Sequence, residues 1–378
     1  MKKVIHMIPT LNMGGAETMV KDYALLLDKK QFEVIIVSLD RRYHSVNEEI
    51  LEQAGIRVIY LSEMRYGGDK KLNIFRKIIR KIARYIDLRN LIKTEKPDVL
   101  HMHLDIGNYI KIIPAKAWGI KLLYTVHNVP ERFFDPSGTD REKYSAYKEI
   151  KRLITNEGLR LIVLHKGMEE PLKRMFNTDN VITVNNGVNL GNFRRELYNK
   201  SEIRRKLGIA EDALLVGHVG RFHEQKNHEL IIRVMNGLLK KEPNAHLLLI
   251  GSGPLQNKIE REIRELGLEN NITILQNRND VPELMAAMDV FFFPSRWEGF
   301  GNVMIEAQNM GMPCVVSDKI HPNVIVNENV KALPLEASMD KWVEAILNGQ
   351  RCVVSEGIDK YDIINSVKTL ENIYRDEK

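Results

Sequence analysis

Two charged residues in the second half of the sequence have a spacing that suits an anionic ligand. Arg221 and Lys226 lie five residues apart, after the apolar run ALLVGHVG and before a helical pattern. An arginine can donate two parallel hydrogen bonds to phosphate oxygens, and a lysine binds them as a point charge. The two side chains can therefore bind the same diphosphate. The same spacing also fits two solvated surface cations, and it leaves both interpretations open.

A pair of glutamates further along the chain frames a loop that can bind an anion. Glu298 and Glu306 are eight residues apart in PSRWEGFGNVMIEA. The glycines between them predict a loop, and we expect Asn302 to cap a new helix. The backbone N–H groups of Gly301–Val303 would then face an anion at the helix start. An acidic pair at such a helix start is unusual for a purely structural motif.

Glycine turns follow two of the apolar runs. Gly14 and Gly15 come after the first run, KKVIHMIP, and Gly251 comes after AHLLLI. Glycine lets the backbone approach a ligand closely, so contacts with phosphate or substrate are one interpretation and a structural turn is the other. Neither turn has the GxGxxG spacing, which argues against a dehydrogenase.

Three histidines lie at the ends of apolar runs in the first half. His101 and His103 end PDVLHMH, and His127 ends KLLYTVH. None has HExxH spacing or a matching carboxylate motif, so we expect no zinc site and structural roles for most of them. His127 precedes a loop with a proline, and there we expect a contact with substrate.

These residues need a scaffold, and the sequence predicts two doubly wound α/β domains. Near-continuous apolar runs alternate with helical patterns in both halves, which is typical of parallel sheets covered on both faces. In such sheets ligands bind beyond the carboxyl ends of the strands, where the residues above lie. The expected strands are KKVIHMIP, FEVIIVSL, IRVIYLS, PDVLHMH, KLLYTVHN, LRLIVLH, VITVNN, ALLVGHVG, AHLLLIGSG, NITILQ, DVFFFPS and MPCVVSD.

Charge is divided unevenly between the halves. Residues 1–195 carry 34 Lys and Arg against 23 Asp and Glu, a net of +11, and residues 196–378 carry 22 against 27, a net of −5. Much of the excess lies in 70–89, where basic and apolar residues alternate at helical spacing. Packing on its own domain is one interpretation, and contact with anionic lipid is another. No nucleic-acid motif accompanies this segment, so we expect no nucleic-acid partner.

The remaining composition is that of an ordinary globular protein. No run approaches the roughly 18 apolar residues of a transmembrane helix, and the start of the chain lacks a signal-peptide cleavage site. The two cysteines, Cys314 and Cys352, cannot build a disulfide framework. We therefore expect a cytoplasmic protein.

The motifs together resemble the retaining GT-B glycosyltransferases of family four, the large bacterial group that builds exopolysaccharides and capsules. The resemblance covers nearly the whole chain and includes MGGAET, PDVLHMH, the VHN strand end, NNGVNLGNF, VGRFHEQKNH, IGSGP and PSRWEGFGNVMIEA. Two positions depart from the pattern, because Asn227 and Asn277 stand where glycine is common.

The resemblance implies two Rossmann-like domains that face a central cleft. Residues 1–190 would form the acceptor-binding domain and 191–358 the nucleotide-sugar-binding domain. The last helix, within 359–378, would cross back to the first domain.

The resemblance also implies a role for each site residue. Arg221 and Lys226 would hold the donor diphosphate. The transferred sugar would contact Glu298 and His127. The remaining contacts with the nucleotide sugar would come from Gly14, Gly15, Gly251, Arg278, Phe300, Gly301, Asn302 and Glu306.

The activity implied is retaining, metal-independent transfer of a hexose or N-acetylhexosamine from a UDP-sugar. The acceptor would be a saccharide or a polyprenyl-diphosphate-linked sugar, and the 70–89 helix would attach the enzyme peripherally to the inner face of the plasma membrane. No DxD-like carboxylate pair follows a strand, so we expect neither a bound metal nor a cofactor. A UDP-sugar epimerase of the same fold and a non-catalytic sugar- or lipid-binding partner remain alternatives.

Overall fold

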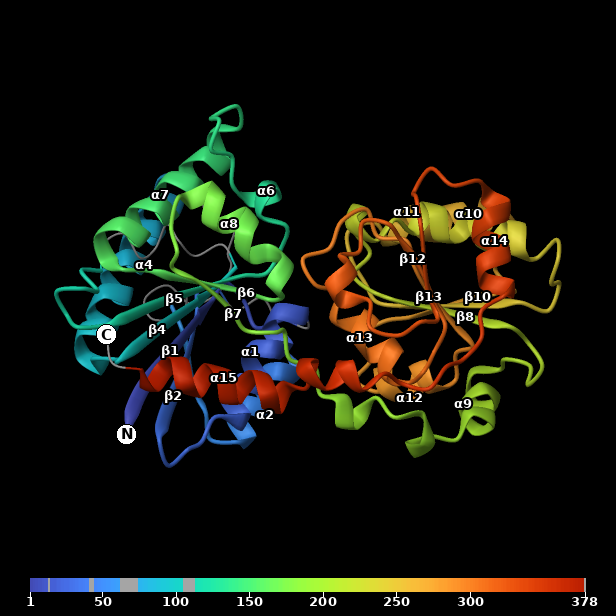
Figure 1. Ribbon diagram of the computed structural model, residues 1–378, viewed down its shortest axis with the longest axis horizontal. Helices are drawn as coiled ribbons and strands as arrows, with labels where there is room; N and C mark the ends of the chain where they lie inside the picture. Colours follow the sequence, from blue (N-terminus) through green and yellow to red (C-terminus); the bar gives the residue numbers. More distant parts are fainter. Residues whose placement is uncertain (13, 41–43, 62–73, 105–112, 377–378) are drawn as a thin grey trace. The chain divides into compact units, whose positions relative to one another are not determined.

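The computed structural model describes residues 1–12, 14–40, 44–61, 74–104 and 113–376, with the side chains of 74–81 left outside this description. The chain divides into two compact units. Unit 1 contains Met1–Gly187 and Ile363–Lys378, and unit 2 contains Val188–Asp362. Each unit is built around one parallel β-sheet with helices packed against it (Figure 1).

The sheet of unit 1 has the strand order β3-β2-β1-β4-β5-β6-β7, and every pairing is parallel. All seven apolar runs predicted in this part of the chain form its strands. They are β1 (Lys2–Ile8), β2 (Phe32–Ser38), β3 (Arg57–Tyr60), β4 (Val99–His103), β5 (Lys121–Val126), β6 (Arg160–Val163) and β7 (Val181–Thr183).

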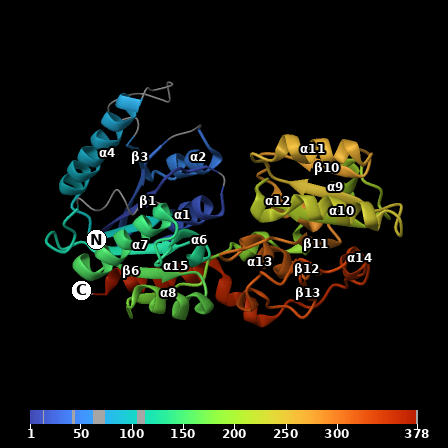
Figure 2. The same cartoon turned by 90° about the horizontal axis from the view of Figure 1, so that it is seen from above.

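Helices cover both faces of this sheet (Figure 2). Successive side chains of a strand point to opposite faces, and both Val4 and its neighbour Ile5 in β1 are 0% exposed. The helices are α1 (Gly15–Leu26), α2 (Val46–Gln53), α4 (Ile74–Glu95), α6 (Pro130–Phe133), α7 (Arg141–Glu157), α8 (Glu169–Phe176) and α15 (Ile363–Arg375). The continuous apolar runs of the strands follow from this double cover.

The last helix returns to unit 1 and completes its core. In α15, Ile363, Val367, Leu370 and Tyr374 are buried in one cluster with residues of α1 and of the central strands. These positions recur every three or four residues, so one face of the helix is apolar. Figure 1 shows α15, in red, beside α1.

The sheet of unit 2 has the order β10-β9-β8-β11-β12-β13, again with parallel pairings only. The five predicted runs form β8 (Leu215–Val219), β9 (His246–Ile250), β10 (Ile272–Leu275), β11 (Val290–Phe293) and β12 (Cys314–Ser317). A sixth strand, β13 (Val330–Leu333), pairs with β12 at the sheet edge. The sequence analysis missed it because its residues are only partly buried and form no apolar run.

The helices of unit 2 pack on both faces of its sheet (Figure 2). Residues of α10, α11 and α14 form one cluster with β-strand side chains, including Trp342 and Phe292, whose rings lie 5.6 Å apart. The helices are α9 (Lys200–Leu207), α10 (His228–Leu238), α11 (Gln256–Glu265), α12 (Val281–Ala286), α13 (Asn302–Asn309) and α14 (Met339–Leu347).

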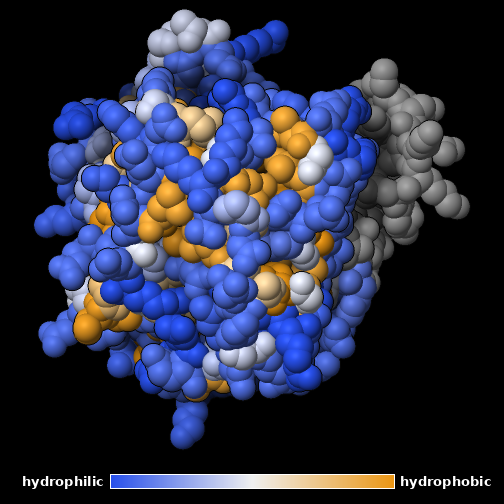
Figure 3. Space-filling model, turned by 90° about the vertical axis from the view of Figure 1, so that its right-hand side faces the viewer, coloured by the Kyte–Doolittle hydropathy of each residue, from blue (hydrophilic) through white to orange (hydrophobic). Residues whose placement is uncertain are grey.

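The outer surface of unit 2 mixes polar and apolar side chains. Figure 3 shows a face of this unit on which hydrophobic residues are interleaved with hydrophilic ones. Exposed apolar side chains in the unit include Leu197, Leu266, Leu347 and Val353. Such mixing is ordinary for a protein surface. Within the described ranges, no helix has the length and apolar character needed to cross a bilayer.

Candidate functional site

The strand order of unit 2 brings its charged motifs to one point. The chain runs outward from β8 to β9 and β10 on one side, and from β11 to β12 and β13 on the other. The order therefore reverses between β8 and β11, and the loops that leave the carboxyl ends of these two strands lie next to each other. A crevice at such a switch point is where open parallel sheets bind ligands. Arg221 and Lys226 follow β8, and Glu298 follows β11.

Lys226 and Glu298 form an ion pair between these two loops. The Lys226 Nζ lies 2.6 Å from the Glu298 Oε1, and the side chains are only 14% and 6% exposed. The same ammonium lies 4.5 Å from the ring centroid of Phe293. The other carboxylate oxygen of Glu298 accepts a hydrogen bond of 3.1 Å from Gln225. The lysine of the first motif and the first glutamate of the second therefore belong to one site.

One backbone and three side-chain hydrogen bonds also join the two loops. The Arg296 N–H donates to the Gln225 carbonyl at 2.7 Å, and the Gln225 amide donates to the Trp297 carbonyl at 3.0 Å. Asn227 donates to the Pro294 carbonyl and accepts from the Arg296 guanidinium, at 3.2 and 3.0 Å. These bonds fix the distance between the loops, so the ion pair is held by its surroundings as well as by its own attraction.

The start of α13 differs in detail from the prediction. Asn302 is the first residue of the helix and not its cap; Gly301 occupies the cap position with a φ of 81° and makes no side-chain cap bond. A glycine tolerates this left-handed conformation at no steric cost. A Cβ on Gly301 would lie 3.7 Å from the Glu298 Cγ, so the buried glutamate lies beside the positive end of α13.

The other predicted residues of unit 2 lie at the same edge of the sheet. Arg221 is exposed one residue beyond Gly220, at the end of β8. Glu306 lies in α13, four residues after Asn302, and is partly exposed. Arg278 is in the loop after β10, where it pairs with Asp280 and lowers the pKa of that carboxyl group. Phe300 is buried, with its ring 5.1 Å from that of Tyr361, and it therefore supports the loop through its side chain.

Gly251 allows the loops after β8 and β9 to touch. Its φ is 150°, and a Cβ at this position would lie 2.0 Å from the Gly220 carbonyl oxygen. The Phe222 N–H donates to the Ser252 carbonyl at 2.9 Å across the same contact. The glycine thus brings a second turn against the one that carries Arg221, as a close backbone approach requires.

Two departures from the family pattern have a common backbone explanation. Asn227 and Asn277, which stand where glycine is usual, have φ angles of 57° and 51°. Asparagine is one of the few non-glycine residues that adopt this left-handed region readily. Both substitutions therefore preserve the turns that place Lys226 and Arg278.

The glycine turn of unit 1 begins a helix, as predicted. Gly14 is the cap residue of α1 and Gly15 its first residue, while Met13 lies outside the described residues. The Glu17 carboxylate already lies against this turn, because a Cβ on Gly14 would come 2.3 Å from its Oε2. An anion bound here would share the helix end with that carboxylate.

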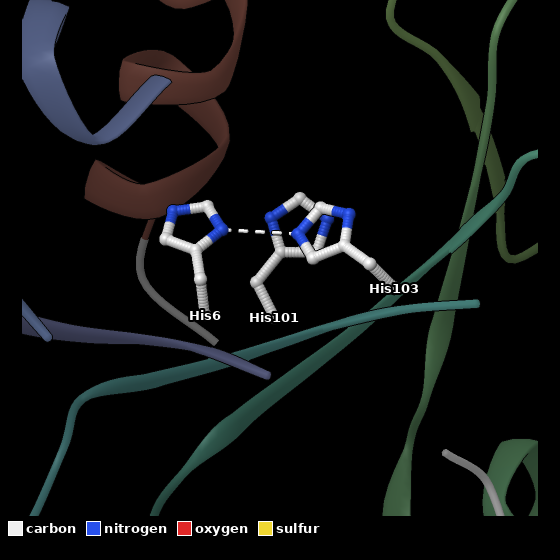
Figure 4. Close-up of side chains that lie close together, drawn as sticks. All are labelled: His6, His101 and His103. Carbon is white, nitrogen blue, oxygen red and sulfur yellow. Dashed lines mark hydrogen bonds between the residues drawn. The ribbon is translucent and has the colours of Figure 1, made fainter. Parts of the chain in front are cut away.

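Histidines from two neighbouring strands of unit 1, β1 and β4, form one buried cluster (Figure 4). His6 in β1 pairs in register with His101 in β4, and His103 lies two residues further on the same face of β4. The His6 Nδ1 lies 3.0 Å from the His103 Nε2, and the His103 Nδ1 lies 3.1 Å from the His127 Nε2. His127 follows β5 and is half-buried, so it joins the cluster to the carboxyl edge of the sheet.

Sequence reasoning missed His6, although a signal was present. The strand KKVIHMIP places His6 on the same face as Val4, and a doubly wound sheet puts its first and fourth strands side by side. Burial then lowers the pKa of His6 and of His127 to about 3 and holds those of His101 and His103 well below the ordinary value. All four imidazoles are neutral at neutral pH.

Two groups among the described residues have ligand atoms close enough to surround a cation. One is His6, His101 and His103, and the other is His44, Glu48 and Glu52. In the first group each ring nitrogen already has a hydrogen-bond partner, and all three rings are fully buried. The second is a surface set in which His44 already contacts both carboxylates. Neither group includes a residue of the Lys226–Glu298 site in unit 2.

The predicted basic helix corresponds to the first part of α4. Lys70 and Lys71 lie outside the described residues, as do the side chains of 74–81. In the described part, Arg84 pairs with Asp40 and the Arg89 guanidinium lies 5.5 Å from the Trp118 ring centroid. Arg84 therefore serves its own unit, which supports the packing interpretation for this residue.

Comparison with known proteins agrees with the geometry of both units. Residues 13–192 match the family model described as Glycosyltransferase Family 4, and residues 199–348 match the model described as Glycosyl transferases group 1. The chain is built from two glycosyltransferase domains.

Relatives over most of the chain carry the same assignment. This glycosyltransferase is 29% identical to EpsF of Bacillus subtilis, which is named as a glycosyltransferase, over 99% of this chain and 96% of that protein. It is 26% identical to the UDP-Gal:alpha-D-GlcNAc-diphosphoundecaprenol alpha-1,3-galactosyltransferase of Escherichia coli, over 79% and 80% of the two chains.

A solved structure shares the fold. HepE of Anabaena, crystallised in complex with UDP and glucose, superposes with a TM-score of 0.76 at 18% identity and over 99% of both chains. The architecture of this glycosyltransferase is therefore GT-B, as the sequence predicted.

Proposed function

We propose that this glycosyltransferase moves a hexose or N-acetylhexosamine from a UDP-sugar to a saccharide or polyprenyl-diphosphate-linked acceptor in surface-polysaccharide biosynthesis, with retention of anomeric configuration. The observation that carries the proposal is the buried Lys226–Glu298 pair, held 2.6 Å apart at the switch point of unit 2. A cation and a carboxylate in one shielded site suit a ligand with an anionic diphosphate and a hydroxyl-rich sugar.

The proposed roles follow from the charges at the site. Departure of UDP builds negative charge on the diphosphate, which Arg221, Lys226 and the start of α13 would stabilise by fixed electrostatics. Glu298 would accept hydrogen bonds from hydroxyls of the transferred sugar, and Glu306 from those of the ribose.

The remaining predicted contacts would complete the donor site. Gly251 would let the backbone approach the diphosphate, and Arg278 would border the nucleobase. His127 and the Gly14–Gly15 turn of unit 1 would contact the sugar and the diphosphate. The acceptor hydroxyl would attack from the face that the diphosphate leaves, with a phosphate oxygen taking its proton.

The proposed transfer needs no metal, because protein cations and a helix start supply the positive charge. The donor test is thermal stabilisation by UDP, GDP, ADP and NAD, each with Mg²⁺ and with EDTA. A ligand at 100 times its dissociation constant stabilises by about 2.7 kcal/mol. We expect UDP to raise the melting temperature both with Mg²⁺ and with EDTA. An unchanged melting temperature with every nucleoside diphosphate would contradict the proposal.

Turnover separates transfer from the alternative activities. With the matching UDP-sugar and a polyprenyl-diphosphate-linked sugar, we expect release of UDP together with a glycosylated acceptor. NMR of the new linkage should give the anomeric configuration of the donor. Conversion of the donor to another sugar without acceptor would indicate an epimerase, and binding without any product would indicate a non-catalytic partner.

Attachment to an anionic membrane through α4 is a second part of the proposal. Ile82 and Ile86, one helical turn apart, are 53% and 45% exposed on this helix, within the basic segment 70–89. Basic residues beside exposed apolar ones are typical of helices that lie at a lipid interface. The basic character of the segment suits a lipid-linked acceptor on an anionic surface.

Vesicle flotation tests this attachment. We expect binding to anionic vesicles at low salt that weakens at high salt. Ile82→Ser/Ile86→Ser should reduce it, whereas Leu197→Ser/Leu266→Ser, which changes exposed leucines of unit 2, should not. Vesicle binding that is unchanged both by high salt and by Ile82→Ser/Ile86→Ser would contradict membrane attachment through α4.

A further inference from the structure

The histidine cluster of unit 1 is part of a longer chain of hydrogen bonds. From His6, the Nε2 lies 3.4 Å from the Tyr374 hydroxyl, and that hydroxyl lies 2.7 Å from the His101 Nδ1. The His101 Nε2 in turn lies 2.7 Å from the Thr125 hydroxyl. The chain runs Thr125–His101–Tyr374–His6–His103–His127 and joins β1, β4, β5 and α15. Its five contacts connect groups that are neutral at neutral pH.

Each imidazole in this chain has one nitrogen that donates and one that accepts. A neutral ring carries a single N–H, and here both nitrogens of His6, His101 and His103 are engaged within the chain. Fixing the proton on any one ring therefore fixes the protons on its neighbours. Two arrangements satisfy every contact and also give the phenol proton an acceptor, and they run in opposite directions along the chain. They give opposite tautomers of His127.

The Tyr374 hydroxyl discriminates between the two directions. A phenol is a stronger donor than an imidazole N–H, and an imidazole nitrogen accepts better than a phenol oxygen. The short contact of 2.7 Å with the His101 Nδ1 therefore suits the O–H as donor, and the contact of 3.4 Å suits a weak N–H donated by the His6 Nε2. In the reverse arrangement the phenol proton would lie on the long contact, which leaves a buried donor nearly unpaired.

The protons can then be followed to the edge of the sheet. With the proton of His6 on Nε2, its Nδ1 accepts from the His103 Nε2, and the His103 Nδ1 accepts from the His127 Nε2. The His127 Nδ1 keeps its lone pair. Among the described residues, no hydrogen bond reaches this atom, and His127 is half-buried at the end of β5.

We propose that Tyr374, acting through His6 and His103, fixes His127 as the tautomer with the proton on Nε2, so that the Nδ1 presents an acceptor for a substrate hydroxyl. The sugar hydroxyl as its donor rests on the function proposed above. Tyr374, His6 and His103 are positioning residues in this arrangement. Burial lowers the pKa of His127 to about 3 and raises that of the Tyr374 phenol well above its ordinary value, so the protons stay where the contacts place them.

Nitrogen NMR tests the assignment without any substrate. In the full chain labelled with ¹⁵N-histidine, long-range ¹H–¹⁵N spectra distinguish a ring nitrogen that carries a proton from one with a lone pair, and His127→Asn identifies the signals. At neutral pH we expect a proton on the His127 Nε2 and none on its Nδ1. A proton on Nδ1, or an equal mixture in the unaltered protein, overturns the proposal.

Tyr374→Phe tests the cause. Loss of the hydroxyl removes the group that distinguishes the two directions, so the tautomer ratio of His127 should fall from about tenfold or more toward unity, a change worth about 1.4 kcal/mol. Tyr23→Phe is the matched control, because Tyr23 is buried in the same core cluster and lies outside the chain of contacts. An unchanged ratio in Tyr374→Phe overturns the role of the phenol. If that variant does not fold, the unaltered protein and Tyr23→Phe still test the assignment, because a proton on the His127 Nδ1 in either of them overturns it.

Two further measurements separate this inference from its alternatives. Added Zn²⁺ should leave the spectrum unchanged; a stoichiometric shift of His6, His101 and His103 would assign them to a metal site and overturn the chain. With a UDP-sugar donor, Tyr374→Phe should raise the KM more than it lowers kcat. If His127 has the predicted tautomer but Tyr374→Phe changes neither KM nor kcat, the chain of hydrogen bonds stands and the contact between His127 and the UDP-sugar is wrong.

Discussion

Replacing Lys226 by methionine tests the candidate donor site directly. The substitution keeps an unbranched side chain and removes the ammonium, which lies 2.6 Å from the Glu298 Oε1 and 4.5 Å from the Phe293 ring centroid. A hydrogen bond to a charged group contributes about 1.5–3 kcal/mol, so the Kd for UDP should rise about 10- to 150-fold. Loss of one contact that stabilises the departing diphosphate should lower kcat by about 100- to 1,000-fold.

The same change also affects the folded state. The Glu298 carboxylate would stay buried, with the Gln225 side-chain amide donating to it at 3.1 Å. An imperfectly paired buried charge costs about 2 kcal/mol, or about 4–8 °C in melting temperature for a unit of this size. Adding Glu298→Gln removes the stranded charge, so the double variant should regain stability and remain inactive.

Calorimetric titration with UDP, assays of UDP release and thermal unfolding measure these effects. Lys258→Met is the matched control, because the Lys258 side chain is 66% exposed in the same unit and its Nζ lies 4.0 Å from the Glu229 Oε2. If Lys226→Met binds UDP and turns over as the control does, Lys226 does not hold the diphosphate. If the double variant is no more stable than Lys226→Met, the buried pair is not the cause of the lost stability.

Three further predictions concern the framework. Arg204 is 1% exposed and forms an ion pair with Asp289, so Arg204→Met should lower the unfolding free energy of unit 2 by about 3–5 kcal/mol. Urea unfolding measures this change, and the same substitution at the exposed Arg205 should leave the stability unchanged. Gly251→Ala should cost at least about 2 kcal/mol in the same measurement, because its Cβ would meet a backbone carbonyl 2.0 Å away; unchanged stability would contradict this close approach. The pKa of His6 is about 3 in the folded protein and about 6.5 in the unfolded chain, so the unfolded state binds more protons between these values. The contribution of His6 to the unfolding free energy should therefore fall by about 1.4 kcal/mol for each pH unit below pH 6.5. Equal unfolding free energies at pH 7.5 and 5.5 would show that His6 is not buried as a neutral imidazole.

The strands of the fold were predictable because their signal is local. A strand covered on both faces must be apolar at every position, and the twelve runs identified in the sequence all form strands. β13 was missed for the opposite reason. Its residues are only partly buried, and its place in the sheet comes from pairing with β12 along its whole length.

The candidate site was predictable residue by residue but not as an arrangement. The spacing of Arg221 and Lys226 indicated a loop at a strand end, and that of Glu298 and Glu306 a loop followed by a helix. The structure places Arg221, Lys226 and Glu298 after strand ends and Glu306 in α13. The direct contact between Lys226 and Glu298 depends on β8 and β11 being neighbours, which no local pattern states. The cap of α13 was predicted at Asn302 and lies at Gly301, because a glycine with a φ of 81° turns the chain one residue earlier.

By itself, the sequence determined which segments become strands, which turns need glycine or asparagine, and which charged residues lie at strand ends. These properties depend on the hydrophobicity, the side-chain alternation and the backbone preferences of neighbouring residues. Only the tertiary structure decided which strand ends meet and how Tyr374, in the last helix, joins His6 near the start of the chain. Such contacts depend on strand order and on the return of α15 to unit 1, because they join groups hundreds of residues apart that share a core.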